Sequence, residues 1–248
     1  MFIKLLIIFW DIGGKMNIAI IGYGKMGHII EKDALNRGHS VVTIDPFAKD
    51  AKFKEINEES LKDVDACIEF TAPTVAVDNI KKIAALKKNM VIGTTAWYDR
   101  LDEAKQAVKE NSVGMIYSPN FSIGVNVFFN IVKYTSKIMN NIKDYDLKMK
   151  EIHHVHKKDA PSGTAKKIKE IIDFEIDRFS DIPIESVREG EVPGTHIVNF
   201  ESDVDTIKLE HEAKSREGFA LGSVMAAEWI KSKKGFFTIE DFMKELIR

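Results

Sequence analysis

The chain has 248 residues, of which 44% are hydrophobic and 30% charged, and its formal net charge at pH 7 is −2. This length accommodates one large domain or two modest ones, and the near-neutral charge gives no electrostatic reason to expect nucleic acid as a partner. The single cysteine excludes a disulfide framework and favours a reducing, cytoplasmic location.

Residues 1–15 differ in character from the rest of the chain. Six apolar residues at 5–10 follow Lys4 as in a signal peptide, but a membrane-spanning helix needs about 20 residues and the segment 11–15 is a poor cleavage site. We therefore expect no membrane association. We interpret residues 1–15 as an upstream extension or a misplaced start, and we expect a chain that begins at Met16 to be active.

A short apolar strand at residues 17–21 runs directly into the sequence GYGKMG, residues 22–27. This G-x-G-x-x-G spacing permits a tight turn, close approach of the backbone to a pyrophosphate, and packing of helix on strand. A helix at 25–37 and a second strand at 40–44 follow, and Asp45 then stands where an acid binds the ribose hydroxyls. The predicted cofactor-binding residues here are Gly22, Tyr23, Gly24, Lys25, Met26, Gly27 and Asp45.

Strands and helices continue to alternate as far as residue 117. Strands are predicted at 66–70, 90–93 and 113–117, separated by helices at 74–87 and 99–110. This order predicts a Rossmann-type, doubly wound parallel sheet, in which ligands bind at the carboxyl ends of the strands. Unless they are ordinary polar loops, the residues that follow these strands are further cofactor contacts: Thr71, Gly93, Thr94, Thr95, Ser118, Pro119, Asn120 and Phe121.

The second half of the chain predicts a smaller α+β domain. Its expected elements are a long helix at 124–141, a helix ending near 178, an alternating strand from 145, and strands at 184–188, 195–200 and 206–211, with a hairpin turn at 201–205. Helices at 219–231 and 239–247 end the chain. We assign residues 16–122 and 217–248 to the dinucleotide-binding domain and 123–216 to a domain for substrate binding and oligomerisation, because a small sheet leaves an edge that invites subunit pairing.

The most informative stretch is EIHHVHKKDAPSGTA, residues 151–165. Three of the seven histidines leave the end of a strand, and two lysines and a turn lead to the N-terminus of a helix. Free N–H groups and the helix dipole at such an end favour a carboxylate or phosphate. Zinc is the other candidate, because His154 and His156 would share one face if the strand extends through them. The only cysteine is Cys67, however, and no helical His-Glu-x-x-His is present, so we expect no metal.

The segment 151–165 resembles the signature of the dihydrodipicolinate reductase family, and the resemblance extends from Met16 to the C-terminus. It implies NAD(P)H-dependent reduction of a cyclic dicarboxylate in the diaminopimelate route to lysine, by a homotetramer assembled through the second domain. It also implies that His153 is the acid/base histidine and Lys157 the proton donor. The implied or suggested substrate contacts are His154, Ser162, Gly163, Thr164 and Arg216.

Two alternatives and the choice of cofactor remain open at this point. The chain could be a related reductase of another amino or imino acid, or a redox sensor that binds a dinucleotide without catalysis. The glycine loop is shorter than in many family members. NADH and NADPH are both candidates, but Asp45 would repel a 2′-phosphate and Pro46 stands where an arginine would accommodate one, which favours NADH.

Overall fold

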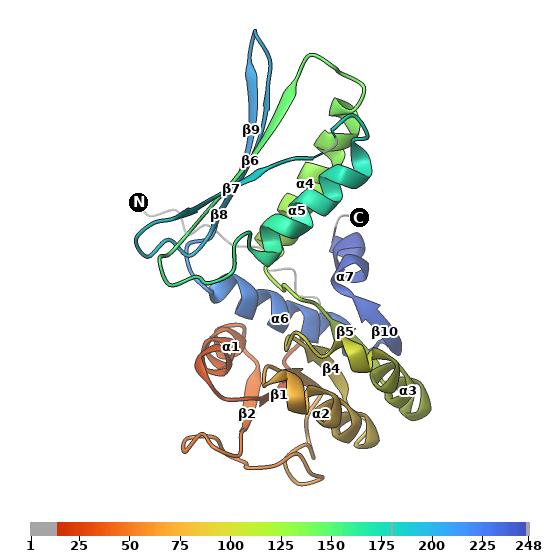
Figure 1. Ribbon diagram of the computed structural model, residues 1–248. Coiled ribbons are helices and arrows are strands. Elements are labelled where there is room, and N and C mark those ends of the chain that lie inside the picture. The colour runs from red at the N-terminus through yellow and green to blue at the C-terminus, as the bar shows by residue number, and fades with distance from the viewer. Residues whose placement is uncertain (1–13, 180, 247–248) are drawn as a thin grey trace, which may run out of the picture. The chain divides into compact units, whose positions relative to one another are not determined.

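The computed structural model describes residues 14–179 and 181–246, and the chain divides into two compact units (Figure 1). The first unit comprises the residues up to Phe121 together with those from Ala220 onward, and the second comprises Ser122–Phe219. Of the proposed extension at residues 1–15, only Gly14 and Lys15 are described, so its interpretation lies almost wholly outside the described residues. None of the described helices is both long and apolar enough to cross a membrane.

The first unit is built on a six-stranded parallel sheet in the order β10-β5-β4-β3-β1-β2. Its strands are β1 (Asn17–Ile21), β2 (Ser40–Ile44), β3 (Ala66–Glu69), β4 (Asn89–Ile92), β5 (Gly114–Tyr117) and β10 (Gly235–Thr238). Nearly all residues of β1, β3, β4 and β5 are buried, as expected for parallel strands that are covered on both faces. The predicted doubly wound sheet is confirmed.

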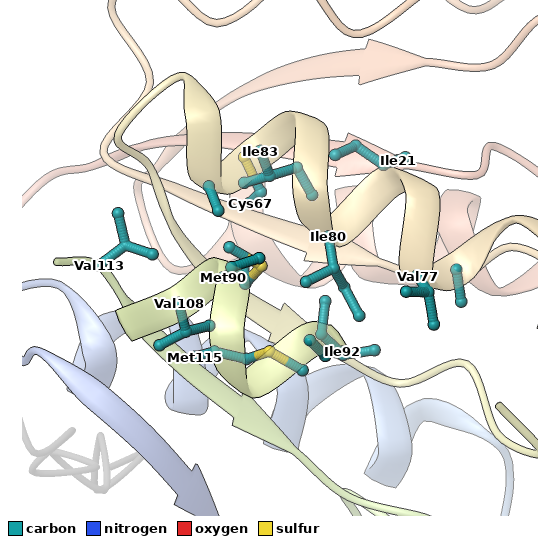
Figure 2. Close-up of a cluster of buried hydrophobic side chains, with 14 of the residues drawn as sticks. Ile21, Cys67, Val77, Ile80, Ile83, Met90, Ile92, Val108, Val113 and Met115 are labelled. Atoms are coloured by element: carbon teal, nitrogen blue, oxygen red, sulfur yellow. The ribbon is translucent and has the colours of Figure 1, made fainter. Parts of the chain in front are cut away.

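The helices that accompany these strands bury their apolar sides against the sheet. They are α1 (Lys25–Asn36), α2 (Pro73–Ala85), the short 3₁₀ helix η1 (Tyr98–Arg100), α3 (Leu101–Asn111), α6 (Glu217–Ile230) and α7 (Ile239–Leu246). Figure 2 shows one cluster of this core, which includes Ile80 of α2, Val108 of α3 and Met90 of β4, and α2 packs beside α3. Burial of such aliphatic side chains stabilises the fold by about 1.5–3 kcal/mol each.

Strand β10 was not predicted from the sequence. The segment 235–238 is only four residues long, follows three lysines and a serine, and stays half-buried throughout, so no periodic pattern marks it. It becomes a strand because β5 offers an edge, and Gly235 pairs with Gly114 across a parallel ladder. The C-terminal segment thereby completes the sheet of the first unit.

The second unit contains a mixed four-stranded sheet in the order β7-β6-β8-β9. Its elements are α4 (Ile123–Met139), β6 (Asp146–His153), α5 (Gly163–Glu175), β7 (Ile184–Arg188), β8 (Thr195–Glu201) and β9 (Thr206–Glu212). Strand β6 runs parallel to β7 and antiparallel to β8, which forms the predicted hairpin with β9. Helix α5 ends at Glu175 rather than near 178.

Strand β6 carries both apolar core residues and buried ionisable residues on its inward face. Its inward residues alternate: Leu147 and Met149 pack with α4 and α5 in the apolar core, and the next two inward positions are Glu151 and His153. Because successive side chains of a strand point to opposite faces, the same periodicity that buries the leucine also buries the glutamate and the histidine. The segment 151–165 therefore begins inside the core.

Candidate active site

The turn between β1 and α1 is shaped by its glycines. Gly22 has φ +91, and a Cβ there would lie 2.1 Å from the carbonyl oxygen of Phe70. A Cβ on Gly27 would lie 2.4 Å from the carbonyl oxygen of Gly22, whereas nothing lies within 4 Å of a Cβ on Gly24. The first and third glycines thus serve the turn and the helix packing, and the second leaves its backbone open to a pyrophosphate. This geometry fits a dinucleotide.

A pocket of about 330 Å³ opens beside this turn. It is lined by Gly24, Lys25, Met26, Gly27, Phe70, Thr71, Pro73, Gly93, Thr94 and Thr95. Eight of the predicted cofactor residues, excluding those of the Ser118–Phe121 segment, are brought together here from the ends of three neighbouring strands, β1, β3 and β4. Phe70 and Pro73 were not among the predicted cofactor residues, although they lie one residue before and two residues after the predicted Thr71.

Asp45 lies beneath the glycine turn. One carboxylate oxygen, Oδ2, accepts a hydrogen bond of 2.8 Å from the backbone N–H of Tyr23, and Oδ1 accepts from the N–H groups of Phe47 and Ala48 at 2.7 and 2.9 Å. Burial alone would raise the pKa of Asp45, but these backbone donors hold the pKa below its ordinary value. The carboxylate is therefore ionised at neutral pH and orients the turn.

The segment after β5 folds on itself beside the same sheet. Ser118 Oγ accepts from the N–H of Asn120 at 3.0 Å and donates to its carbonyl at 2.8 Å, and Phe121 is buried. Pro119 is exposed. These residues do not line the pocket described above, and their contact with a cofactor stays a prediction.

Glu69, a residue that the sequence did not single out, lies fully buried at the end of β3 beneath the pocket wall. Its Oε1 accepts hydrogen bonds from the hydroxyl of Thr71 and, at 3.3 Å, from the amide of Asn79. The backbone N–H of Thr71 donates a hydrogen bond of 2.7 Å to Oγ1 of Thr94. Burial raises the pKa of Glu69 above its usual value, against the lowering effect of these donors.

We therefore expect the stability of the protein to respond to Glu69 as pH rises. A raised folded-state pKa means that stability is fully present below the unfolded pKa of about 4.3 and is lost as pH rises through the folded value. Relative to Glu69→Gln, the wild-type free energy of unfolding should fall between pH 5 and pH 8, by at most about 1.4 kcal/mol per pH unit. Urea denaturation at several pH values measures the difference.

The control for this titration is Glu103→Gln. Glu103 is a surface carboxylate whose pKa is lowered to about 2 by hydrogen bonds from Arg100 and Lys81. Its difference from wild type should be flat between pH 5 and pH 8, because it is ionised in both states. If the difference in free energy of unfolding between wild type and Glu69→Gln is also independent of pH, the pKa of Glu69 is not raised in the folded protein.

In the second unit, the end of β6 delivers a buried cluster. His153 is 6% exposed and its Nδ1 lies 3.5 Å from Oε2 of Glu151, which is fully buried. The ring of His196, from β8, packs edge-on against His153 at a centroid distance of 5.2 Å. Burial lowers the pKa of His153, while the carboxylate of Glu151 raises it, and the net direction is down. The imidazole is therefore mostly neutral at pH 7 and can accept a proton.

Lys157 lies in the loop that follows β6. Its ammonium contacts the carboxylate of Asp159 at 2.8 Å, and its side chain is 23% exposed. Arg188, from β7, holds this loop by donating to the carbonyl oxygens of Lys157 at 3.3 Å and Asp159 at 2.6 Å. The loop that carries the predicted proton donor is thus fastened to the sheet.

Ser162 caps helix α5. Its hydroxyl accepts from the N–H of Ala165 at 3.1 Å, so the helix begins at Gly163 as predicted. The first N–H groups of the helix, on Gly163 and Thr164, have no intrahelical acceptor, and Gly163 is exposed. Together with the helix dipole they offer a site for a carboxylate.

The remaining predicted site residues are placed as follows. His154 follows the last residue of β6 and donates its backbone N–H to the carbonyl of Val192 at 2.8 Å. His156 lies in a turn, with its side chain 74% exposed, and not on the extended strand that the sequence suggested. The strand ends at His153 because residues 154–157 form a turn closed by the Lys157 N–H on the carbonyl of His154. Arg216 is exposed between β9 and α6, and its role stays a prediction.

A parallel sheet with a pocket at its glycine turn, and a separate mixed-sheet unit that carries a buried glutamate and buried histidines, are the arrangement expected of a nicotinamide-dependent oxidoreductase. Comparison with known families specifies which one. The model of "Dihydrodipicolinate reductase, N-terminus" matches residues 16–121, and that of "Dihydrodipicolinate reductase, C-terminus" matches residues 124–243. The chain belongs to the dihydrodipicolinate reductase family, and the resemblance noted in the sequence is confirmed.

Curated relatives give the same result along almost the whole chain. A 4-hydroxy-tetrahydrodipicolinate reductase of Christiangramia forsetii is 40% identical over 245 residues, which cover 94% of this chain and 100% of the relative. Another reductase of that name, from Archaeoglobus fulgidus, is 37% identical over 261 residues, with 92% and 100% covered. The predicted enzyme class, an NAD(P)H-dependent oxidoreductase, is confirmed.

Solved structures support the fold. A dipicolinate-bound dihydrodipicolinate reductase from Paenisporosarcina sp. TG-14 superposes with a TM-score of 0.75 at 24% identity and covers 92% of this chain and 99% of its own. A meso-dapdh variant from Clostridium tetani gives a TM-score of 0.55 at 15% identity, with 92% and 94% covered. At these identities the likeness concerns the fold alone.

Proposed function

We propose that this chain reduces 4-hydroxy-tetrahydrodipicolinate to tetrahydrodipicolinate in the diaminopimelate route to lysine, with Lys157 as proton donor and His153 as acid/base group. Family membership supports the reaction, and the dipicolinate bound to the Paenisporosarcina relative supports a cyclic dicarboxylate as substrate. The observation that carries the roles is the buried Glu151–His153 pair next to the Lys157 loop and the N-terminus of α5.

Each group has a chemical task in this proposal. The bound nicotinamide supplies the hydride when the cofactor is present. Lys157, held by Arg188 through its carbonyl, donates a proton to the atom of the ring that gains electron density. The N–H groups of Gly163 and Thr164 and the hydroxyl of Thr164 bind one carboxylate, and His154 and Arg216 are the candidates for further substrate contacts.

The experiment is a turnover assay on the purified chain. Oxidation of NADH or NADPH is followed with cyclic substrate formed from pyruvate and aspartate semialdehyde, and the product is identified by mass spectrometry. Reduction of the cyclic substrate is expected. Turnover only with another imino acid would assign the chain to a related reductase, and cofactor binding without any turnover would favour a sensor.

The preference for NADH rests on Asp45, which is ionised and lies at the glycine turn. Its charge repels a 2′-phosphate, so Asp45→Ala should lower the ratio of kcat/KM for NADH to kcat/KM for NADPH by roughly 10-fold. Both cofactors should also bind more weakly, because the N–H of Tyr23 loses its acceptor. Asp50→Ala, which removes an exposed aspartate paired with His28, is the control and should leave the ratio unchanged. An unchanged ratio in Asp45→Ala would show that another group discriminates.

Two further properties belong to the same proposal. We expect a homotetramer assembled through the second unit, whose sheet ends in the edge strands β7 and β9. We also expect a cytoplasmic enzyme, because reduced nicotinamide is its co-substrate and its one cysteine, Cys67, is buried as a free thiol. Light scattering of the purified protein tests the tetramer.

A further inference from the structure

We infer that Glu151 is the positioning residue of this site: one buried carboxylate that orients His153, fastens the Lys157 loop through Arg188, and fixes the start of helix α5 through Ser162. The inference rests on the proposed function for its catalytic consequence, but the arrangement itself stands on the geometry. We assign Glu151 no contact with a reacting atom. It acts through the groups that do.

The contacts of Glu151 come from four elements. Both carboxylate oxygens accept the backbone N–H of Ser162 at 3.1 Å, and Oε1 also accepts the hydroxyl of Ser186 at 2.8 Å and Nη2 of Arg188 at 3.3 Å. Its Oε2 faces Nδ1 of His153 at 3.5 Å and Nε2 of His196 at 3.9 Å. A fully buried carboxylate with so many polar neighbours is anchored from every side.

These contacts lead directly to the proposed catalytic groups. Arg188, which binds the carboxylate with Nη2, uses the same nitrogen to hold the carbonyl of Asp159 and its Nε to hold that of Lys157. Ser162, whose N–H binds the carboxylate, caps α5 with its hydroxyl and contacts Nε2 of His196 at 3.2 Å. Removing the carboxylate would therefore take away the negative charge beside His153 and release the lysine loop and the helix start.

The carboxylate also sets the charge balance at His153. The groups that face this imidazole are Glu151 from β6, Lys157 and Asp159 from the loop, Arg188 from β7 and His196 from β8. Burial, Lys157 and Arg188 lower the pKa of His153, and the carboxylates of Glu151 and Asp159 oppose them. Glu151 is itself ionised, since hydrogen bonds from Ser162 and Ser186 outweigh the effect of burial and lower its pKa.

The side chains of Glu151, His153 and His196 also satisfy the spacing of a metal site, with candidate ligand atoms within 4.8 Å of one another. The hydrogen bonds argue against that use. Both oxygens of Glu151 already accept a hydrogen bond from the N–H of Ser162, Oε1 also accepts from Ser186 and Arg188, and the guanidinium 3.3 Å from Oε1 would repel a cation. The cluster therefore has the donor set of a hydrogen-bonded network.

The test compares Glu151→Gln with Glu185→Gln. Both replace a glutamate of the same sheet by its neutral isostere, but Glu185 is exposed and forms a surface ion pair with Lys150 at 2.9 Å. Glu151→Gln should lower kcat/KM by at least about 10-fold, as loss of an orienting carboxylate does elsewhere. The pKa of His153, followed by NMR of the imidazole and by the pH profile of kcat/KM, should fall by about one unit or more, because the nearest anion is lost. Glu185→Gln should change neither.

Glu151→Asp keeps the charge but retracts it by one methylene. It should preserve the His153 pKa better than glutamine does while still lowering the rate, and it provides the measurement if the glutamine variant does not fold. The NMR titration needs no substrate, so it tests the coupling even if the proposed reaction is wrong. An unchanged His153 pKa and rate in Glu151→Gln would overturn the inference. So would tight binding of zinc chloride by the wild type that is lost in this variant.

Discussion

Lys157→Ala is expected to lower kcat by roughly 10²- to 10⁴-fold, the usual contribution of a positioned general acid. The lysine side chain is only 23% exposed, and its ammonium lies 2.8 Å from Asp159. Because Arg188 also holds the backbone of its loop, the ammonium is restricted in position. The cofactor pocket is formed by residues of the first unit, so the dissociation constant for NADH should barely change. Steady-state kinetics and cofactor titration measure the two effects.

Neighbouring variants separate this role from a general loss of positive charge. Lys158→Ala removes an exposed lysine at the next position and should keep nearly full turnover. Thr164→Val removes a hydroxyl at the start of α5, and its effect should appear mainly in KM, by about 1–3 kcal/mol if a bound carboxylate loses a partner. Wild-type turnover in Lys157→Ala would refute its assignment as proton donor.

The two other histidine variants extend the comparison. His153→Ala should resemble Lys157→Ala, because the imidazole is buried at the centre of the cluster. His156→Ala should be mild. The structural reason differs from the one that the sequence suggested, because His156 lies in a turn with its side chain 74% exposed, 3.5 Å from Glu191. A loss in His156→Ala as large as that in Lys157→Ala would mean that the roles within residues 151–165 are wrong.

Most of the fold could be predicted because its signals are local. The parallel strands are short apolar runs such as NIAII at Asn17–Ile21, and the alternation of strands with helices predicts the sheet type without any knowledge of contacts. The exception, β10, has no such signal. Its four half-buried residues form a strand only because Gly235–Thr238 pairs with β5, more than 100 residues earlier in the chain.

The site shows the same limit more sharply. His153 and Lys157 could be found because they share one continuous motif. The residues that bind the carboxylate of Glu151 could not be found in this way, because Ser186 lies 35 positions and Arg188 lies 37 positions after Glu151 in the chain. A signal for Glu151 itself was present, since it continues the inward alternation of Leu147 and Met149 on β6. A glutamate on a core face contradicts ordinary burial preferences, and its position becomes stable through these distant partners together with the N–H of Ser162.

Gly27→Ala is expected to destabilise the protein, although alanine normally stabilises a helix by about 1 kcal/mol relative to glycine. Gly27 lies in the first turn of α1, and its added Cβ would lie 2.4 Å from the carbonyl oxygen of Gly22, a backbone atom that cannot rotate away. The turn must shift, at a cost of about 1–3 kcal/mol typical of overpacking, and NADH binding should be largely lost.

Gly24→Ala is the matched variant, because a Cβ there meets no atom within 4 Å. Its free energy of unfolding should stay within about 0.5 kcal/mol of wild type. If the backbone at this position approaches the pyrophosphate, the methyl group stands between them, and affinity for NADH should fall by roughly 10-fold or more. Urea denaturation without cofactor and titration of tryptophan fluorescence with NADH give the two quantities for each variant. Gly27→Ala should therefore lose stability and binding together, whereas Gly24→Ala should lose binding alone. If Gly24→Ala binds NADH with the same affinity as the wild type, the added methyl group does not obstruct the cofactor. The pyrophosphate then does not approach the backbone of the second glycine, and its predicted position at this turn is wrong.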